Sequence, residues 1–407
     1  MTHHQQIFQT DSPTRWNTFL WSMRVALFLA VLGFAAVGVA LLRNSNPQMP
    51  KLISEVDDFK KLTKPDNPLQ FKNAPHHKLH NALRKPAIQT QIRAGFYVNW
   101  DLQSYFSLKN NISKMNMVLP EWLFIDPKAD TIVAEIDPKA FALLDSSKAK
   151  VVPLLSNNFK SVWNDSSVSR IVSTPKSRKV FIAHLLGVLK RYGFDGVSID
   201  FEDLYSLRSD GDLVEFHHEL YDSLHAHHLI ASQCIPPFNE DYRINELHKF
   251  NDYIFVMAYD QHFPTTAPGT VSDGKWVEQV LDVFTAKIHP EKFILCLAGY
   301  GYDWLKGGTG IDITYQEALT IAKESEGKID FDNNGYNLHY DYLDDEDRPH
   351  EVWFTDAATN YNIMRTASSY GLAGVALWRL GSEDSRLWSF YDKDLNADSL
   401  KLNPTDL

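Results

Sequence analysis

The sequence predicts a (β/α)8 barrel, an α/β fold, over residues 91–393, and two observations carry that prediction. Eight apolar strand-like runs alternate with helix-like periodic segments between residues 92 and 378. Polar and aromatic residues follow the ends of most of these runs, which is where barrels of this kind carry their functional groups. A chain of 407 residues with 44% hydrophobic side chains is large enough for such a core.

The predicted strands occupy regularly spaced apolar runs. They are residues 92–98, 115–119, 149–155, 194–201, 229–235, 253–258, 293–299 and 373–378. Helices are expected between them, for example at Lys179–Tyr192, Asp212–His225 and Trp276–Ala286. The interval from 299 to 373 is too long for one helix and contains strand-like pieces at 329–331, 338–342 and 352–355. We therefore expect a small α+β insertion after the seventh strand, at about 303–370.

The fourth strand has the most informative pattern of the chain, Asp195-Gly-Val-Ser-Ile-Asp-Phe-Glu202. Alternation places Ser198, Asp200 and Glu202 on one face of this strand and apolar residues on the other. Parallel strands are usually covered on both faces, so inward carboxylates are costly to bury without a task or a partner. An ordinary antiparallel strand with one solvated face is the competing interpretation.

Chemically active side chains also follow the other predicted strands at the same end of the barrel. They are Tyr97 and Trp100 after the first strand, Glu121 after the second, Asn157 after the third, Met257, Tyr259 and Asp260 after the sixth, Tyr300 after the seventh and Trp378 after the eighth. This ring of carboxylates, phenols and indoles is typical of a carbohydrate cleft. The sequence has no Gly-x-Ser-x-Gly elbow and no His-Glu-x-x-His pair, which disfavours serine hydrolases and zinc proteases.

Charge and cysteine content exclude several other classes of protein. A net charge of −11 argues against nucleic-acid binding, which needs a basic surface. Cys234 and Cys296 lie in separate apolar runs and predict two buried free thiols, without a disulfide framework. His225, His227 and His228 lie at the end of an expected helix, where pairing with the helix dipole is their simplest role. We predict neither a cofactor nor a metal.

The N-terminal region predicts attachment to a membrane. Residues 25–42 contain no charged side chain and are bracketed by Arg24 and Arg43, so this run just reaches the length of a membrane-spanning helix. We expect a short segment at 1–24, an uncleaved signal-anchor at 25–42, a proline-broken stalk at 43–90 and a C-terminal tail at 394–407. A cleaved signal peptide is the alternative, with a poor cleavage site at 36–40. The anchor predicts a single-pass protein of the cell membrane with its barrel in the periplasm or outside the cell.

Three motifs of this chain resemble the signatures of the family-18 glycoside hydrolases, the chitinases and their relatives. The motifs are Asp195-Gly-x-x-x-Asp200-x-Glu202, Met257-x-Tyr259-Asp260 and Trp378, in that order. The resemblance implies that Glu202 is the general acid and that Asp200 and Tyr259 hold the substrate's acetamido group during substrate-assisted hydrolysis. The expected substrate contacts are Asp260, Met257, Trp378, Tyr97, Trp100, Glu121 and Ser198.

One residue departs from the family pattern. Many chitinases have a third aspartate where this chain has Ser198, and a serine can donate a hydrogen bond to Asp200 but cannot take up its charge. The spore-cortex-lytic branch of the family also departs at this position. The change predicts a reduced rate or a shifted pH optimum.

A second, narrower resemblance is to the family-18 module of bacterial envelope proteins, and it covers residues 96–101, 107–111 and 374–384. The two resemblances imply a membrane-anchored hydrolase of β-1,4- or β-1,6-linked N-acetylglucosamine polysaccharide, with a polysaccharide deacetylase or glycosyltransferase as a partner. Two alternatives stay open: a chitinase-like lectin with little turnover, and an accessory module of polysaccharide synthesis.

Overall fold

A computed structural model describes Trp21, Arg24, residues 91–393 and residue 395, apart from 206, 208–209, 240–241 and 333–334. The predicted membrane span at 25–42, the stalk at 43–90 and nearly all of the tail lie outside the described residues. In the part of the chain that the structure describes, no helix has the length and apolar character needed to cross a bilayer.

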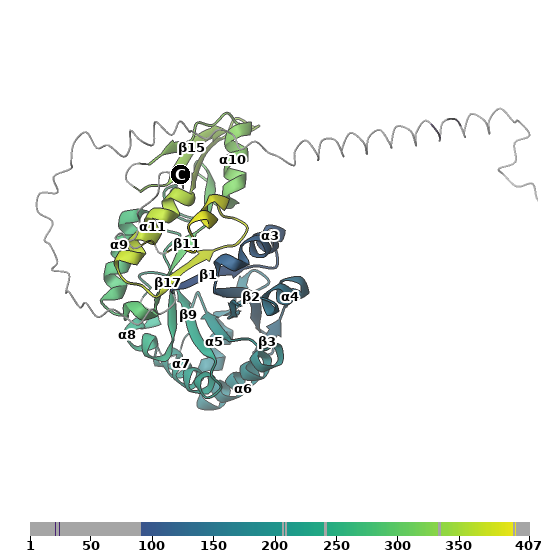
Figure 1. Cartoon of the computed structure of the whole chain (residues 1–407), viewed down its shortest axis with the longest axis vertical. Helices are drawn as coiled ribbons and strands as arrows, with labels where there is room; N and C mark the ends of the chain where they lie inside the picture. Colours follow the sequence, from purple (N-terminus) through teal and green to yellow (C-terminus); the bar gives the residue numbers. More distant parts are fainter. Residues whose placement is uncertain are drawn as a thin grey trace, which may run out of the picture. The chain divides into compact units, whose positions relative to one another are not determined.

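Eight parallel strands close into a ring, as the sequence predicts (Figure 1). Each strand pairs with the next, and β1 pairs with both β17 and β2, which completes the barrel. The strands are β1 (Ile92–Tyr97), β2 (Met117–Asp126), β5 (Leu154–Ser156), β8 (Gly196–Asp200), β9 (Ile230–Ile235), β10 (Tyr253–Met257), β11 (Phe293–Ala298) and β17 (Gly374–Trp378).

Short strands extend the barrel at its second and third positions. β4 (Lys150–Val151) pairs with β2 just before β5, and the break between them contains Pro153, which has no N–H to give to a ladder. β3 (Thr131–Ala134) folds back antiparallel on β2. β6 (Asn158–Phe159) and β7 (Val162–Trp163) form a separate hairpin directly after β5.

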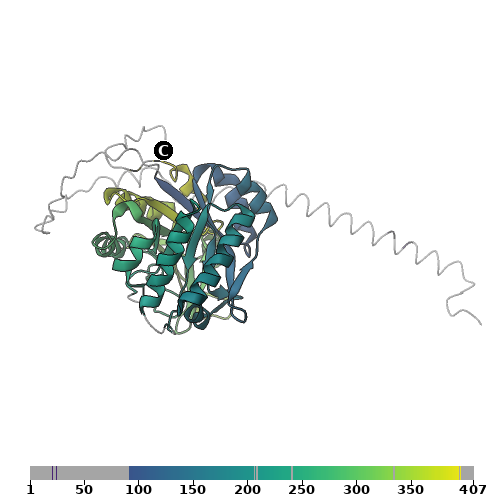
Figure 2. The same ribbon diagram turned by 90° about the horizontal axis from the view of Figure 1, so that it is seen from below.

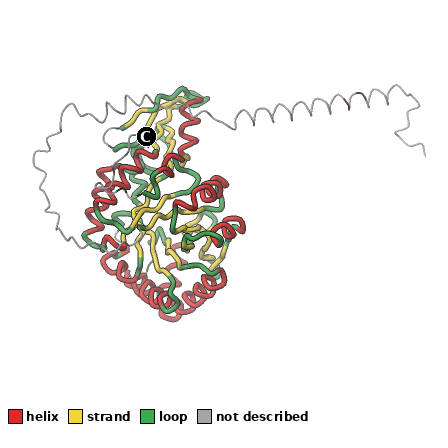
Figure 3. The backbone as a smooth tube through the Cα atoms, in the orientation of Figure 1, coloured by secondary structure: helices red, strands yellow, loops and turns green. Residues whose placement is uncertain are grey.

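Helices surround the barrel on the outside (Figures 2 and 3). They are α3 (Leu102–Asn111), α4 (Pro138–Asp145), α5 (Asp165–Val172), α6 (Pro175–Tyr192), α7 (Asp210–His225), α8 (Ile244–Leu247), α9 (Gly274–Thr285) and α11 (Ala357–Ser369), with 3₁₀ turns η1 (Ile112–Lys114), η3 (His248–Phe250), η4 (Pro290–Lys292) and η5 (Ser385–Ser389). The predicted helices therefore lie where the periodicity placed them, with boundaries that differ by a few residues.

The sequence around α6 shows how these boundaries are set. Thr174 and Ser177 form a capping box at its first turn, each side chain bonding the other's backbone N–H. Gly193 ends the helix in the left-handed conformation, at φ 68°, which glycine adopts without steric cost. The chain then turns directly into β8, the strand that carries Asp200.

Alternation along each strand divides the apolar residues between two cores. Outward residues such as Val197 and Ile199 pack with the helices in one large cluster. Inward residues such as Phe96 and Phe255 fill the barrel in a second cluster, together with both cysteines. Cys234 and Cys296 are buried and free, as the sequence predicts. Complete burial of a large apolar side chain stabilises the fold by about 1.5–3 kcal/mol, so these two clusters hold the barrel together.

A second, antiparallel sheet follows β11 and makes up the insertion. Its strands, in spatial order, are β13 (Gly310–Thr314), β12 (Tyr300–Leu305), β16 (Pro349–Phe354), β15 (Leu338–Leu343) and β14 (Asp330–Phe331). α10 (Tyr315–Glu324) packs on this sheet through its own small apolar cluster. The inserted sheet thus spans 300–354, whereas the interval of about 303–370 expected from sequence also took in α11, which packs on barrel strands β11 and β17.

Candidate active site

Strand β8 carries two carboxylates to one end of the barrel. Ser198 and Asp200 point inward, while Val197 and Ile199 pack outward against the helices. Asp200 is 8% exposed, and Glu202 follows two residues later on the same face. The fully buried Asn157 fixes Glu202 in place, because its Oδ1 accepts the Glu202 N–H at 2.9 Å and its Nδ2 donates to the Glu202 carbonyl at 2.8 Å.

Both carboxylates open into a cavity of about 950 Å³ at the carboxyl ends of the strands. Six carboxylate side chains and several aromatic rings line it. They include Glu121, Glu135, Asp200, Glu202, Asp203 and Asp260, with Trp100, Trp163, Tyr259, Trp276 and Trp378. A cavity of this size accommodates several sugar rings, and its mixture of rings and polar groups suits a carbohydrate.

Burial raises the pKa values of the two central carboxyl groups. The pKa of Glu202 lies well above its ordinary value because the group is buried and because Asp200, Asp203 and Asp260 oppose its ionisation. Burial and the nearby Glu121 raise the pKa of Asp200 to about 7, against a hydrogen bond from Ser156 that lowers it. A carboxyl group that keeps its proton at neutral pH can act as a general acid.

Tyr259 and Asp260 follow β10 on the neighbouring side of the cavity. The Asp260 carboxylate accepts hydrogen bonds from Tyr302, at 2.7 Å, and from Tyr300, both on β12 of the inserted sheet. Burial raises the pKa of Asp260, and these two phenols lower it. The Tyr259 ring packs edge-on against Tyr300, with centroids 6.0 Å apart. The insertion therefore orients a carboxylate that belongs to the barrel.

Two indoles bound the cavity on the side of β1. Trp378 ends β17 and packs edge-on against Phe96 at 5.3 Å, and Met257 lies in the same inner cluster. Trp100 is 62% exposed, yet its Nε1 donates to Glu121 at 2.9 Å and the Arg379 guanidinium lies 4.1 Å from its ring centroid. Trp100 is thus held by two partners while much of its ring remains open to a ligand.

Two residues expected at the cleft lie elsewhere in the structure. Tyr97 does not line the cavity: it belongs to the outer core, where it donates to Asp137, and its neighbour Phe96 points inward instead. Ser198 points inward but is completely buried below the cavity, and its Oγ lies 3.6 Å from Cys234 Sγ. The hydrogen bond expected from Ser198 to Asp200 is supplied by Ser156 on the adjacent strand β5.

Several residues of the site had no role in the sequence prediction. Asn157 and Tyr300 were recognisable as residues at strand ends, but nothing in the sequence indicated that they bond Glu202 and Asp260. Tyr302 lies on β12 and Glu135 directly follows β3, and neither strand is among the eight predicted barrel strands. Among the described residues, no group of three metal-binding side chains is present.

A closed parallel barrel with a buried carboxyl pair in an aromatic cleft defines a glycosidase of the barrel type. The comparisons with known proteins agree with that class. Residues 154–384 match the model of the glycosyl hydrolases family 18, so the chain belongs to this family and the resemblance seen in the sequence is confirmed.

The most informative relatives are bacterial. The uncharacterised glycosylase YvbX of Bacillus subtilis is 25% identical over 305 residues, which cover 72% of this chain and 88% of the relative. The cortical fragment-lytic enzyme of the same organism is 24% identical over 282 residues, covering 66% and 65%.

Two solved structures share the fold. A chitinase from Chromobacterium violaceum has a TM-score of 0.69 at 22% identity, over 75% of this chain and 98% of that one. The spore cortex-lytic enzyme SleL of Bacillus megaterium has a TM-score of 0.67 at 19% identity, over 75% and 74%.

Proposed function

We propose that this glycosidase hydrolyses β-linked N-acetylglucosamine polysaccharide, joined 1,4 or 1,6, by substrate-assisted catalysis with retention of configuration. The observation that carries the proposal is the position of Asp200 and Glu202, two residues apart at the carboxyl end of β8 and facing the same cavity. Residues at this spacing lie ~7 Å apart and on the same side of a bound sugar. Neither can attack from the face opposite the leaving group while the other protonates it.

The substrate's own acetamido oxygen is placed to make that attack. Glu202 protonates the glycosidic oxygen, which its raised pKa permits at neutral pH. The acetamido oxygen bonds to the anomeric carbon as the glycosidic bond breaks, and Asp200 accepts the acetamido N–H as positive charge develops. Tyr259 donates to the acetamido oxygen. Glu202, now a carboxylate, takes a proton from water, and this water opens the intermediate on the original face.

Asp260 and Trp378 serve binding in this proposal. Asp260, oriented by Tyr300 and Tyr302, accepts hydrogen bonds from the hydroxyls of the cleaved sugar. Trp378 forms the apolar floor beneath that sugar, and Met257 packs beside it. The related proteins include a chitinase, and chitin is a polymer of β-linked N-acetylglucosamine, which supports this class of substrate.

The mechanism is tested with matched oligosaccharides that differ only at the 2-amino group. Fully N-acetylated oligomers of N-acetylglucosamine, linked 1,4 or 1,6, should be cleaved, with products identified by mass spectrometry. Fully de-N-acetylated oligomers should not be cleaved, and a thiazoline analogue of the cyclic intermediate should inhibit. Comparable turnover of the de-N-acetylated oligomer would contradict substrate assistance. Binding of the acetylated oligomers without any turnover would favour the lectin-like alternative.

We also propose that the chain is anchored in the cell membrane, with its barrel on the outer side. The support is the uncharged run at 25–42 between Arg24 and Arg43. Full-length protein should remain in the membrane fraction after carbonate extraction. Recovery of the intact, uncleaved chain in the soluble fraction would contradict the anchor.

A further inference from the structure

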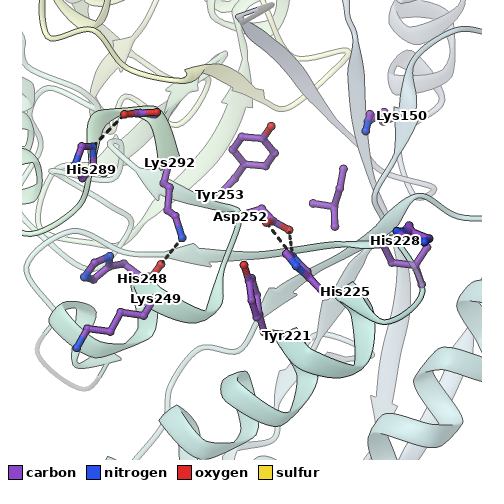
Figure 4. A pocket seen from close by; sticks show the side chains of 13 residues that line it. Lys150, Tyr221, His225, His228, His248, Lys249, Asp252, Tyr253, His289 and Lys292 are labelled. Carbon is purple, nitrogen blue, oxygen red and sulfur yellow. Dashed lines mark hydrogen bonds and ion pairs between the residues drawn. The ribbon is translucent and has the colours of Figure 1, made fainter. Parts of the chain in front are cut away.

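The starts of the barrel strands border a second cavity, which we call the basal pocket. It has a volume of about 850 Å³ and is bordered by the end of α7, by η3 and η4, and by the first residues of β4, β9 and β10 (Figure 4). Tyr253 is the first residue of β10, whereas Met257, the last residue of the same strand, lines the active-site cavity. The two cavities therefore lie at opposite ends of the barrel.

Three lysines surround the basal pocket, namely Lys150, Lys249 and Lys292. Lys292 is partly buried, and its Nζ donates to the carbonyls of Asn251 at 2.7 Å and His248 at 3.1 Å, which hold the ammonium in place. Burial lowers the pKa of Lys292, so an anion beside it would replace hydration that the group has lost. Lys150 and Lys249 make no side-chain hydrogen bond or ion pair within the described ranges.

Imidazole and phenol groups complete the wall between the lysines. His248 lies beside Lys292 on one side, and His225 and His228 lie on the other (Figure 4). The phenols of Tyr221 and Tyr253 lie between these two groups (Figure 4). Apart from His225, whose Nε2 already faces Asp252, each of these side chains can donate at least one hydrogen bond in its neutral form. The pocket therefore offers donors as well as positive charge.

The two acidic residues of the basal pocket are already engaged. Asp252 accepts the Ala231 N–H at 2.9 Å and contacts His225 Nε2 at 3.0 and 3.1 Å. Glu291 lies 3.4 Å from His289. The contacts of Asp252 and Glu291 do not remove their negative charges, but the three lysines still exceed the two carboxylates of the pocket by one positive charge, although the chain as a whole carries a net charge of −11.

We propose that the basal pocket binds a phosphate group. Clustered ammonium groups with neighbouring N–H and O–H donors match the charge and the several acceptor oxygens of a phosphate. The phosphate could be free, or it could belong to a phosphodiester such as a lipid headgroup. The site is independent of the carbohydrate cleft, so it extends the proposed function without resting on it.

The test is calorimetric titration of the full-length chain at constant ionic strength, with chloride as the reference anion. Inorganic phosphate probes a free or monoester phosphate, and glycerophosphoglycerol probes the diester of a lipid headgroup. The double variant Lys150→Gln/Lys249→Gln should weaken binding by about tenfold or more, because it removes two positive charges whose side chains make no hydrogen bond or ion pair with the described residues. The matched variant Lys179→Gln/Lys323→Gln, which removes two exposed charges elsewhere, should change affinity less than about twofold.

The outcomes separate the two sources of the phosphate and can reject the site. Binding of inorganic phosphate that depends on Lys150 and Lys249 supports a free or monoester ligand. Binding of the diester alone, with the same dependence, supports a lipid-type headgroup. Failure of the full-length chain to bind either probe in the millimolar range would overturn the proposal, as would equal weakening by both double variants.

Discussion

The two ends of the barrel differ in the sign of their charge and in how deeply that charge is buried. At the carboxyl ends, Asp200 and Glu202 are enclosed, and burial together with repulsion from neighbouring carboxylates raises their pKa values. At the opposite end, Lys150 and Lys249 are exposed in an open pocket. The same strands reach both ends, so the comparison shows that side-chain burial, rather than the barrel itself, prepares one end for proton transfer.

The largest expected effect is at the deeply buried end, at Glu202. Glu202→Gln keeps the shape of the side chain but removes the proton that the leaving oxygen needs, so kcat on N-acetylated oligomers should fall by roughly 10²–10⁴-fold. Oligomer binding, measured by calorimetry, should be nearly unchanged. Glu324→Gln, on the exposed face of α10, is the matched control and should retain full activity. Unchanged turnover in Glu202→Gln would remove Glu202 from its assigned role.

The second effect is a pH dependence of stability at Asp200. Because the pKa of Asp200 is raised from 3.8 to about 7, the folded protein binds a proton at this carboxyl group more tightly than the unfolded chain does. The stability that this proton contributes is therefore full below pH ~4 and is lost as the pH rises through 7. Asp200→Asn does not titrate. The free energy of unfolding of the variant, relative to that of the wild type, should therefore increase by about 1–4 kcal/mol from acidic to mildly alkaline pH.

Urea unfolding of the two proteins at several pH values measures this difference. Two results would show that the carboxyl group is not held in its protonated form. The stability of Asp200→Asn relative to the wild type could be as high at pH 4 as at pH 8, or it could show no increase by pH 8.

A smaller effect is expected at Asn157, which positions Glu202 without contacting the reacting atoms. Asn157→Ala leaves two backbone groups of Glu202 unpaired and should lower kcat by about 10–100-fold. KM should change much less. Asn157→Asp retains the acceptor for the Glu202 N–H and should have an intermediate rate. If the alanine variant lost thermal stability but kept its full kcat, Asn157 would be a structural residue only.

The smallest effect is expected near the strand starts, where charges are exposed. Lys114, just before β2, contacts Asp392 at 2.8 Å, and both side chains are about one-third exposed. Lys114→Gln should change the free energy of unfolding by less than about 1 kcal/mol, because exposed ion pairs are screened by water. Its kcat should equal that of the wild type. A destabilisation clearly larger than about 1 kcal/mol would contradict the comparison between the two ends.

The sequence predicted those features that depend on local periodicity. The eight strands follow from the apolar runs, and the inward face of β8 follows from the alternation of polar and apolar residues within its own run. The two carboxylates were recognisable from that face alone. Tyr97 was expected in the cleft but lies in the outer core, because a shift of one residue along a strand moves a side chain to the other face. The role of Ser156, in place of Ser198, depends on how β5 lies beside β8, which no single run encodes.

Contacts between distant segments account for what the sequence could not indicate. Tyr302 reaches Asp260 only because β12 folds over the barrel, and β12 pairs with β16 almost fifty residues further along the chain. The basal pocket assembles histidines from 225 to 289, of which His225 and His228 were interpreted only as the end of a helix. Such sites require the tertiary fold before they can be recognised.

The closure of the ring by β17 has a consequence for synthesis of the protein. Gly374 aligns with Ile92 on one side and with Ile294 on the other, and its Cα lies so close to the Ile92 carbonyl that a Cβ would come within 2.0 Å of it. At roughly 5–20 residues per second, a ribosome needs on the order of tens of seconds to make the chain between Ile92 and Gly374. Until residues 374–378 are made, the edges of β1 and β11 that β17 covers have no partner strand, and the ring stays open to pairing with other chains.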